Sequence, residues 1–260
     1  MTKPAVILIG ADKGGVGKTT VTRTVIDYLS ARGIRVRGFD TETPKGTLKR
    51  FHPDIAQVVD INSVSDQMKI FDTLSSGHQP ITVIDIRASQ MSPTLNMLND
   101  IGFIRAAADV QMSFAVFHVL GPTIASLEEI AKTADYLGDA HYFIVKNFIN
   151  DSQFFEWHDA TYRLYFNQFN NAVEVTVPKL NEMAMEQVDI ASVPFATFVA
   201  NKLQNGLPAS YSFVLRGYVR NWLDKVGAEY NRINLLQLGT RGTLQNGDQS
   251  KASGRQDRVA

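Results

Sequence analysis

Residues 5–29 read AVILIGADKGGVGKTTVTRTVIDYL, an apolar run that leads through a glycine-rich segment into a stretch with helical spacing. The apolar run is typical of a buried parallel strand, and apolar residues recur on one side of a helix after Thr19. Glycines between the two let the backbone turn tightly and direct successive N–H groups at a polyphosphate, while the helix N-terminus adds positive potential. The stretch therefore predicts a strand, a phosphate-binding loop and a helix. A glycine turn that binds no ligand is the plainer alternative.

The expected nucleotide contacts lie in the loop and the first helical turn. Lys18 would reach the β- and γ-phosphates of a nucleotide, and the hydroxyl of Thr19 would hold Mg²⁺. Two residues depart from the ordinary pattern GxxxxGKS/T, because Asp12 stands at the first position in place of glycine and a second lysine, Lys13, lies inside the loop. The residues expected to hold the nucleotide are Gly14, Gly15, Val16, Gly17, Lys18, Thr19 and Thr20.

The segment KGGVGKTT, residues 13–20, resembles the deviant Walker A motif of the ParA/MinD family of P-loop ATPases. In that family the first lysine reaches across a nucleotide-bound homodimer to the partner's phosphates, so the resemblance implies this role for Lys13. Spacing alone indicates only that a second cation lies near the phosphates. The resemblance further implies ATP and Mg²⁺ as ligands, an ATP-dependent homodimer, and slow hydrolysis that a partner protein stimulates.

Composition excludes several other classes of protein. The 260 residues are 44% apolar and 20% charged, as in an ordinary soluble globule, and 26 basic residues balance 26 acidic ones, so no overall field attracts nucleic acid or anionic membrane. The chain has no cysteine, which excludes disulfides, thiolate metal sites and cysteine-held iron–sulfur clusters. Neither a secretory signal nor an apolar stretch long enough to span a bilayer is found, and we expect a cytoplasmic location.

An acidic pair follows the second expected strand. That strand covers residues 35–39 and ends at Asp40, and Glu42 stands two positions later in the turn segment FDTETPKGTL. Carboxylates at this edge of a parallel sheet, beside a phosphate loop, are placed to organise Mg²⁺ or the attacking water; a solvated acidic turn is the alternative.

The same segment resembles switch I of the family, whose pattern is Asp-x-Asp. Asp40 matches the first Asp, and Glu42 falls where the second, water-orienting Asp is expected. The resemblance thus implies that Asp40 and Glu42 act in catalysis together with Lys13 and Lys18. Glutamate extends the carboxylate by one methylene, so hydrolysis here is expected to be slower or differently positioned.

The segment PITVIDIRAS, residues 80–89, is an apolar strand that ends at Asp85. An aspartate in this place is the Walker B pattern, able to hold Mg²⁺ through its water shell. The expected metal site is therefore Thr19, Asp40 and Asp85. Arg87 stands where the family often has proline or a small residue. It could face the nucleotide, a dimer partner or solvent, and we expect solvent or an interface.

Two further elements bear on the nucleobase. The segment HYFIVKNFIN, residues 141–150, reads as a buried strand that ends at Asn147. An asparagine here contacts adenine in the family, whereas spacing alone fits a turn-forming residue equally well. The segment TVPKL, residues 176–180, follows a strand expected over 172–177 and resembles the family's loop beside the adenine, which implies that Pro178 packs against the base.

Alternating strands and helices predict an α/β fold of P-loop NTPase type, with a mostly parallel central sheet and helices on both faces. We expect one domain over residues 1–238 and a disordered tail over 239–260, which lacks apolar periodicity. The other expected elements are a strand over residues 58–62 and helices over 63–76, 92–104, 123–137, 181–188 and 194–203, with a long final helix introduced by Pro208.

What the switch would position is left open. Arg216 and Arg220 lie four apart on the final helix and form, with Lys202 and Lys225, a modest basic patch that would contact nonspecific DNA; solvated surface charge is the alternative. Such a switch would partition DNA, use the nucleoid as a track or position another cargo. MinD-like membrane association through residues 233–242 is a weaker alternative, because that segment has few charges. A P-loop ligase or synthase acting on a small metabolite is the third alternative, and a scaffold that does not hydrolyse ATP is also open because of Glu42.

Overall fold

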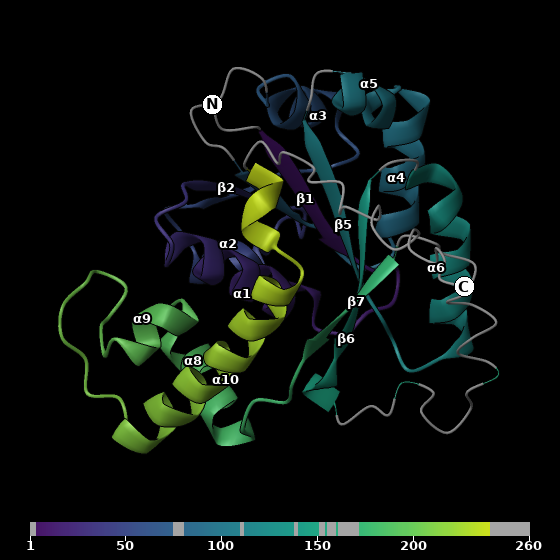
Figure 1. Ribbon diagram of the computed structural model, residues 1–260. Coiled ribbons are helices and arrows are strands. Elements are labelled where there is room, and N and C mark those ends of the chain that lie inside the picture. The colour runs from purple at the N-terminus through teal and green to yellow at the C-terminus, as the bar shows by residue number, and fades with distance from the viewer. Residues whose placement is uncertain are drawn as a thin grey trace, which may run out of the picture.

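The computed structural model describes residues 4–74, 81–109, 112–137, 140–150, 154, 160 and 172–239. A seven-stranded sheet runs through the middle of the molecule in the order β3-β2-β4-β1-β5-β6-β7, and every neighbouring pair is parallel (Figure 1). The predicted parallel α/β fold is therefore confirmed. The strands are β1 (Ala5–Gly10), β2 (Val36–Asp40), β3 (Ala56–Val58), β4 (Ile81–Asp85), β5 (Ser113–Val119), β6 (His141–Asn147) and β7 (Ala172–Val177).

Helices cover both faces of this sheet. In Figure 1, α4 and α6 lie on one side, and α1, α2 and α8 to α10 lie on the other. The helices are α1 (Lys18–Ser30), α2 (Thr47–Phe51), α3 (Val64–Phe71), α4 (Met91–Asp100), α5 (Phe103–Asp109), α6 (Ile124–Leu137), α8 (Glu182–Ala191), α9 (Phe195–Val199) and α10 (Phe213–Arg232). Two 3-10 turns, η1 (Phe148–Asn150) and η2 (Leu235–Gly239), follow β6 and α10.

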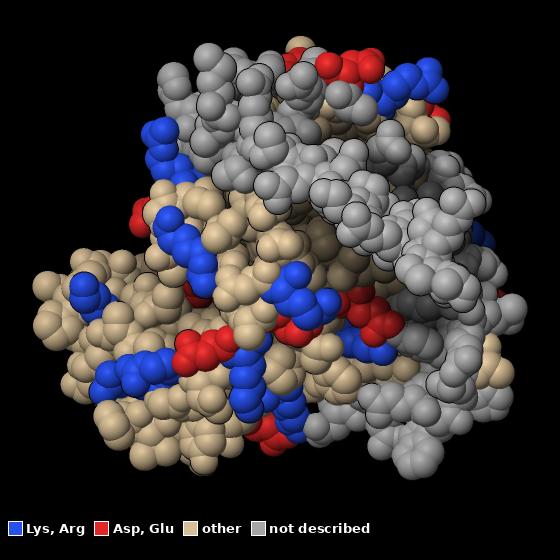
Figure 2. Space-filling view, in the orientation of Figure 1, with Lys and Arg blue, Asp and Glu red and all other residues tan. Residues whose placement is uncertain are grey.

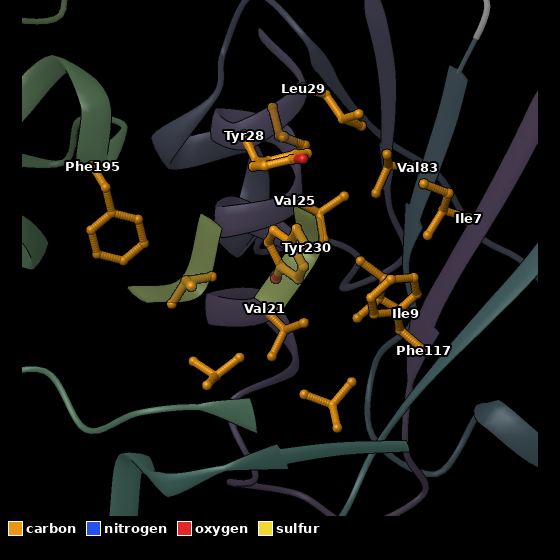
Figure 3. Packing of buried hydrophobic residues seen from close by; sticks show 14 of the residues in the cluster. Ile7, Ile9, Val21, Val25, Tyr28, Leu29, Val83, Phe117, Phe195 and Tyr230 are labelled. Carbon is orange, nitrogen blue, oxygen red and sulfur yellow. The ribbon is translucent and has the colours of Figure 1, made fainter. Parts of the chain in front are cut away.

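Strand β1 is buried along its whole length because both of its faces are covered. Ile7 and Ile9 belong to the apolar cluster beneath α1 and α10, whereas Val6 and Leu8 belong to the cluster beneath α4 and α6. Figure 3 shows the first cluster, in which side chains of α1 and Tyr230 of α10 surround Ile9. Each such side chain contributes about 1.5–3 kcal/mol by leaving water, so this packing holds the end of β1 firmly in place.

Helix α10 docks against α1 through polar contacts as well. The Tyr230 hydroxyl lies 2.7 Å from Thr24 Oγ1, and the Tyr28 hydroxyl donates to Asn231 Oδ1 at 2.6 Å. One face of this helix is apolar and buried, with Val219, Trp222 and Val226 beside Tyr230. Because α1 begins at the glycine-rich loop, α10 supports that loop from behind.

Several predicted boundaries were wrong for local reasons. The strand expected over residues 58–62 lies over 56–58, because the Asp60 carboxylate accepts the Asn62 N–H at 3.0 Å and turns the chain. The helix expected over 194–203 ends at Val199, and Asn201, with φ of 58°, is left-handed. The final helix begins five residues after Pro208, where the Ser212 hydroxyl accepts the Leu215 N–H.

The helix expected to start at Ser92 begins at Met91 and stops at Asp100, and Gly102, with φ of 70°, separates it from α5. Of the tail predicted over 239–260, Gly239 is the last residue of η2, and residues 240–260 lie outside the described residues. Among the helices in the described part of the chain, none combines the length and apolarity needed to cross a bilayer.

Candidate functional site

The predicted catalytic residues gather where β1, β2 and β4 end. Asp40 and Asp85 close neighbouring parallel strands and are direct partners in the register, and Ile9 of β1 pairs with Asp85 from the other side. The glycine-rich loop, residues 11–17 and here called the phosphate loop, leaves β1 at this point and enters α1. Carboxyl ends of parallel strands are where α/β proteins bind ligands.

A pocket of about 300 Å³ lies over the phosphate loop and is called the phosphate pocket here. Gly15 and Gly17 give it its shape, with φ of 75° and 84°, a region that other residues seldom adopt. Among the described side chains none caps the N-terminus of α1, which leaves its N–H groups for a ligand. The pocket is lined by Gly14, Gly15, Gly17, Lys18, Thr19, Thr20, Glu42, Thr47, Asp85, Ile86, Arg87 and Ala88.

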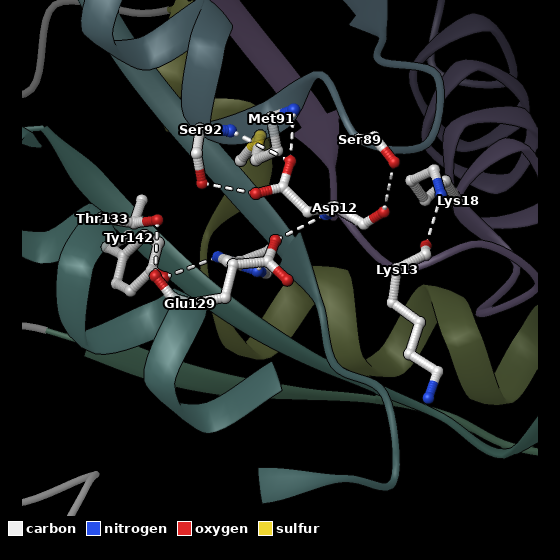
Figure 4. Close-up of polar contacts among 10 residues, drawn as sticks. Asp12, Lys13, Lys18, Ser89, Met91, Ser92, Glu129, Thr133 and Tyr142 are labelled. Carbon is white, nitrogen blue, oxygen red and sulfur yellow. Dashed lines mark hydrogen bonds and ion pairs between the residues drawn. The ribbon is translucent and has the colours of Figure 1, made fainter. Parts of the chain in front are cut away.

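The two lysines of the loop are placed differently. Lys18 is 9% exposed, and its Nζ donates to the Lys13 carbonyl oxygen at 2.7 Å. Burial lowers the pKa of Lys18, although Asp85 and other nearby carboxylates act against that shift. Lys13 is exposed and does not line the phosphate pocket. Its side chain passes Gly121, where an added Cβ would lie 3.1 Å from Lys13 Cδ, and its amine points away from Lys18 (Figure 4).

Asp85 is 4% exposed and is held from α1 on both oxygens. Thr19 Oγ1 donates to Asp85 Oδ2 at 2.7 Å, and Thr22 Oγ1 donates to Oδ1 at 2.8 Å. Burial raises the pKa of Asp85 to about 7; the Asp40 charge adds to that rise, and the two threonine bonds oppose it. The sequence reading missed Thr22, although it stands three residues after Thr19 and so on the same helix face.

Asp40 organises the loop after β2. It is fully buried, and its oxygens accept the N–H groups of Glu42 at 2.9 Å and of Lys49 at 3.0 Å. Glu42 reaches the phosphate pocket, which Asp40 does not line, and it accepts a hydrogen bond from the Thr47 hydroxyl. The structure thus places Asp40 beneath the loop and Glu42 on its surface.

Thr41 joins this loop to the one that follows β4. Its hydroxyl donates to the Asp85 carbonyl oxygen at 3.0 Å and accepts the Arg87 N–H at 2.9 Å. Arg87 itself is half-buried and lines the phosphate pocket. The loops after β2 and β4 are therefore tied together beside the pocket.

The residues predicted to contact a nucleobase lie elsewhere in the site. Asn147 is 3% exposed, and its Nδ2 donates to the carbonyl oxygens of Val16 at 3.0 Å and Gly17 at 3.4 Å. The carbonyl oxygen of Pro178 accepts the Trp222 Nε1–H at 2.6 Å. A separate cavity of about 660 Å³ lies beside them, lined by Thr20, Arg23, Ile149, Lys179, Leu180, Glu182, Met185, Glu186, Asp189 and Ile190. A base contact by Asn147 or Pro178 stays a prediction.

The predicted basic patch is smaller than its sequence suggests. Lys202 and Arg220 are exposed, whereas Arg216 is half-buried and donates to the Val199 carbonyl oxygen at 3.4 Å. In Figure 2, basic and acidic side chains are interspersed on the face that carries α10, without a broad basic field.

The donor set fits a polyphosphate and a hard cation. A buried lysine, a glycine-shaped loop and an uncapped helix N-terminus suit phosphate oxygens. A threonine hydroxyl beside a buried carboxylate supplies oxygen ligands of the kind that Mg²⁺ prefers. Thr19 and Asp85 would hold such a cation, and Asp40 lies close behind them.

Known proteins show the same fold. The ParA family ATPase from Chlorobium tepidum TLS matches with a TM-score of 0.51 at 13% identity, covering 85% of this chain and 98% of that one. The septum site-determining protein MinD from Pyrococcus horikoshii OT3, solved in complex with Mg-ADP, matches with a TM-score of 0.53 at 16% identity, covering 91% and 99%. At such identities the likeness establishes the fold alone.

One relative and one family model match the sequence itself. Protein MobD from Acidithiobacillus ferrooxidans is 23% identical over 151 residues, which are 55% of this chain and 63% of MobD, so the match spans under two thirds of that relative. The family model of the CobQ/CobB/MinD/ParA nucleotide binding domain matches residues 7–209, which include the phosphate loop, both acidic strand ends and Asn147. The chain therefore belongs to the CobQ/CobB/MinD/ParA nucleotide-binding domain family.

Proposed function

We propose that the protein is an ATP-dependent, dimerising switch ATPase of the ParA/MinD type. It hydrolyses ATP slowly in the presence of Mg²⁺ until a partner protein stimulates it, and it positions or partitions DNA or another intracellular cargo. The single observation that carries the proposal is the different placement of the two loop lysines: Lys18 lines the phosphate pocket of its own chain, and Lys13 stands outside that pocket.

Each residue of the pocket has a task in this proposal. The phosphate loop and Lys18 bind the β- and γ-phosphates of ATP, and Thr19 and Asp85 hold Mg²⁺, with Asp40 behind them. The ion neutralises charge on the phosphoryl oxygens as it develops during transfer. Glu42 lines the pocket and orients the attacking water, and its bond to Thr47 keeps the carboxylate in place.

Lys13 supplies the link between two subunits. Lys18 is held by its hydrogen bond to the Lys13 carbonyl oxygen, whereas the Lys13 amine points away from Lys18 and from the phosphate pocket of its own chain. This placement suits Lys13 to reach a nucleotide bound in a second subunit. ATP bound in one subunit would then be contacted by Lys13 of the other. Nucleotide state becomes oligomeric state, and a partner that prefers one form shifts the equilibrium.

Light scattering in the presence of a non-hydrolysable ATP analogue and Mg²⁺ tests this mechanism. The wild type is expected to be dimeric with the analogue and monomeric with ADP. Lys13→Ala is expected to bind ADP but to stay monomeric, and Lys18→Ala to lose nucleotide binding. Lys69→Ala is the matched control, because Lys69 is an exposed lysine on α3 whose ion-pair partner among the described residues is Asp66. A Lys13→Ala protein that dimerises like the wild type contradicts the proposal.

Among the possible partners of the switch, we favour nonspecific DNA. Residues 190–223 contain no Asp or Glu, and Lys202 and Arg220 are exposed within them. Two or three phosphate contacts give weak, sequence-independent binding that falls as salt rises. Co-sedimentation with duplex DNA is expected only with the ATP analogue, and the double variant Lys202→Ala, Arg220→Ala is expected to abolish it. Binding to anionic liposomes instead favours the membrane alternative, and a new covalent product formed with ATP favours the ligase.

A further inference from the structure

We propose that Asp12 is a positioning residue of the phosphate site: it locks the loop that follows β4 onto the phosphate loop, and Glu129 and His118 hold it from behind. The inference rests on the proposed ATPase function. Asp12 occupies the position where the ordinary pattern has glycine.

The Asp12 carboxylate caps α4 from a distant part of the chain. Its Oδ1 accepts the N–H groups of Met91 at 2.8 Å and Ser92 at 3.2 Å, and its Oδ2 accepts the Ser92 hydroxyl at 2.5 Å (Figure 4). Residue Gln90, which precedes the helix, makes no side-chain cap. An acidic side chain at this place satisfies N–H groups that the helix itself cannot.

The backbone of Asp12 holds the same loop. Its carbonyl oxygen accepts the Ser89 N–H at 2.8 Å, and Ser89 has a left-handed φ of 63°. Between Asp85 and Ser89 lie the residues that line the phosphate pocket on this side, Arg87 among them. Side chain and carbonyl of Asp12 therefore hold the end of this turn at which the chain enters α4.

A polar chain that runs from half-buried Glu129 to buried His118 and Tyr142 meets Asp12 from the side of the sheet. The Asp12 N–H donates to Glu129 Oε1 at 2.5 Å, and that oxygen lies 2.9 Å from His118 Nε2. His118 is fully buried, and its Nδ1 lies 2.9 Å from the Tyr142 hydroxyl. These residues come from α6, β5 and β6, so the chain anchors the phosphate loop to the far half of the sheet.

Asp12 is the direct neighbour of Lys13, whose carbonyl oxygen holds Lys18 in the proposed nucleotide site. A shift of Asp12 therefore moves the Lys13 backbone, Lys18 and the Arg87 turn together. Glycine at this position would keep the loop flexible but would leave α4 without its cap and the turn without its clamp.

Steady-state ATP hydrolysis by Asp12→Ala tests the inference. Displacements near 1 Å in an active site cost up to about a hundredfold in rate, so we expect kcat to fall at least about tenfold with KM for ATP and ADP affinity within about threefold. Asp12→Asn keeps an oxygen for the α4 N–H groups and is expected to recover most of the rate. Glu129→Ala is expected to lower kcat as Asp12→Ala does, and exposed Glu128→Ala is the matched control.

Amide hydrogen exchange gives a readout that does not depend on turnover. Residues 86–92 are expected to exchange faster in Asp12→Ala than in the wild type, both with and without ADP, whereas α10 exchanges as before.

A wild type that fails to hydrolyse ATP refutes the proposed function, and the exchange experiment then still tests the role of Asp12. An Asp12→Ala protein with wild-type kcat and wild-type exchange overturns the inference, as does one that loses only thermal stability. Should Asp12→Ala fail to fold, equal rates in Asp12→Asn, Glu129→Gln and Glu129→Ala overturn it.

Discussion

The Thr22 hydroxyl donates a hydrogen bond of 2.8 Å to Asp85 Oδ1, and this bond joins the second turn of α1 to the end of β4. Thr19 occupies the other oxygen of the same carboxylate at 2.7 Å. Asp85 is thus held between two hydroxyls in a buried place, where its charged form is disfavoured and its pKa rises to about 7. A cation bound beside Asp85 would therefore stabilise the charged form of this carboxylate, which burial disfavours.

Asp85 makes the stability of the protein without nucleotide depend on pH. The pKa of Asp85 is raised above the unfolded value of about 3.9, so its contribution to stability is complete below about pH 4 and is lost as the pH rises through about 7. Asp85→Asn replaces the titrating group by a neutral one and so removes this dependence on pH. We expect the variant to melt at a higher temperature than the wild type at pH 8 and to lose that advantage at pH 4 to 5, as measured by thermal unfolding.

Asp27 and His52 also make stability depend on pH, so the quantity to measure is the difference in melting temperature between the wild type and Asp85→Asn. Burial raises the pKa of Asp27 to about 6, which acts in the same direction, and lowers the pKa of His52 to about 3. The lowered His52 value acts with the opposite sign, because stability from His52 increases as the pH rises from 3 to 6.5. Both groups are present in wild type and variant, so they cancel. A difference in melting temperature that is constant from pH 4 to 8 contradicts the assignment to Asp85.

Gly17 and Gly15 form a matched pair for testing the phosphate loop. Both have positive φ, but a Cβ on Gly17 would lie 2.2 Å from Asn147 Nδ2, whereas a Cβ on Gly15 meets nothing within 4 Å. Gly15→Ala is expected to cost about 1–2 kcal/mol of unfolding free energy from backbone strain alone, and Gly17→Ala more than that. Denaturant unfolding measures both values. Equal costs would show that the Asn147 contact does not constrain the loop.

The parts of the site that could be predicted from the sequence are those encoded within a few residues. The strand, loop and helix around Lys18 and the strand that ends at Asp85 have local patterns, and both were placed correctly. The start of α4 was predicted at Ser92, but the sequence did not indicate that Asp12, 80 residues away, would cap this helix. Periodicity reports which face of an element is buried, but it does not report which polar side chain meets a distant helix end.

Glu42, which we propose orients the attacking water, lines the phosphate pocket. Glu42→Ala is expected to lower kcat at least about a hundredfold, the lower range for loss of a residue that assists proton transfer, with little change in KM. Thr47→Val removes the hydroxyl that donates to Glu42 and is expected to lower kcat by a smaller factor. Phosphate release measured under saturating ATP compares them. An unchanged rate in Glu42→Ala excludes Glu42 from the reaction.

Asn147 could hold the phosphate loop or contact adenine, and one substitution distinguishes these two roles. Its Nδ2 donates to the carbonyl oxygens of Val16 and Gly17, so Asn147→Ala is expected to loosen the phosphate loop and to weaken binding of any polyphosphate. A residue that reads adenine would affect ATP alone. We expect the affinities for ATP, GTP and inorganic tripolyphosphate, measured by calorimetry, to fall by the same factor of about tenfold, because one intramolecular hydrogen bond contributes about 0.5–1.5 kcal/mol. Exposed Asn205→Ala, on the turn before α10, is the control and leaves all three affinities unchanged. A loss confined to ATP would instead assign Asn147 to the base.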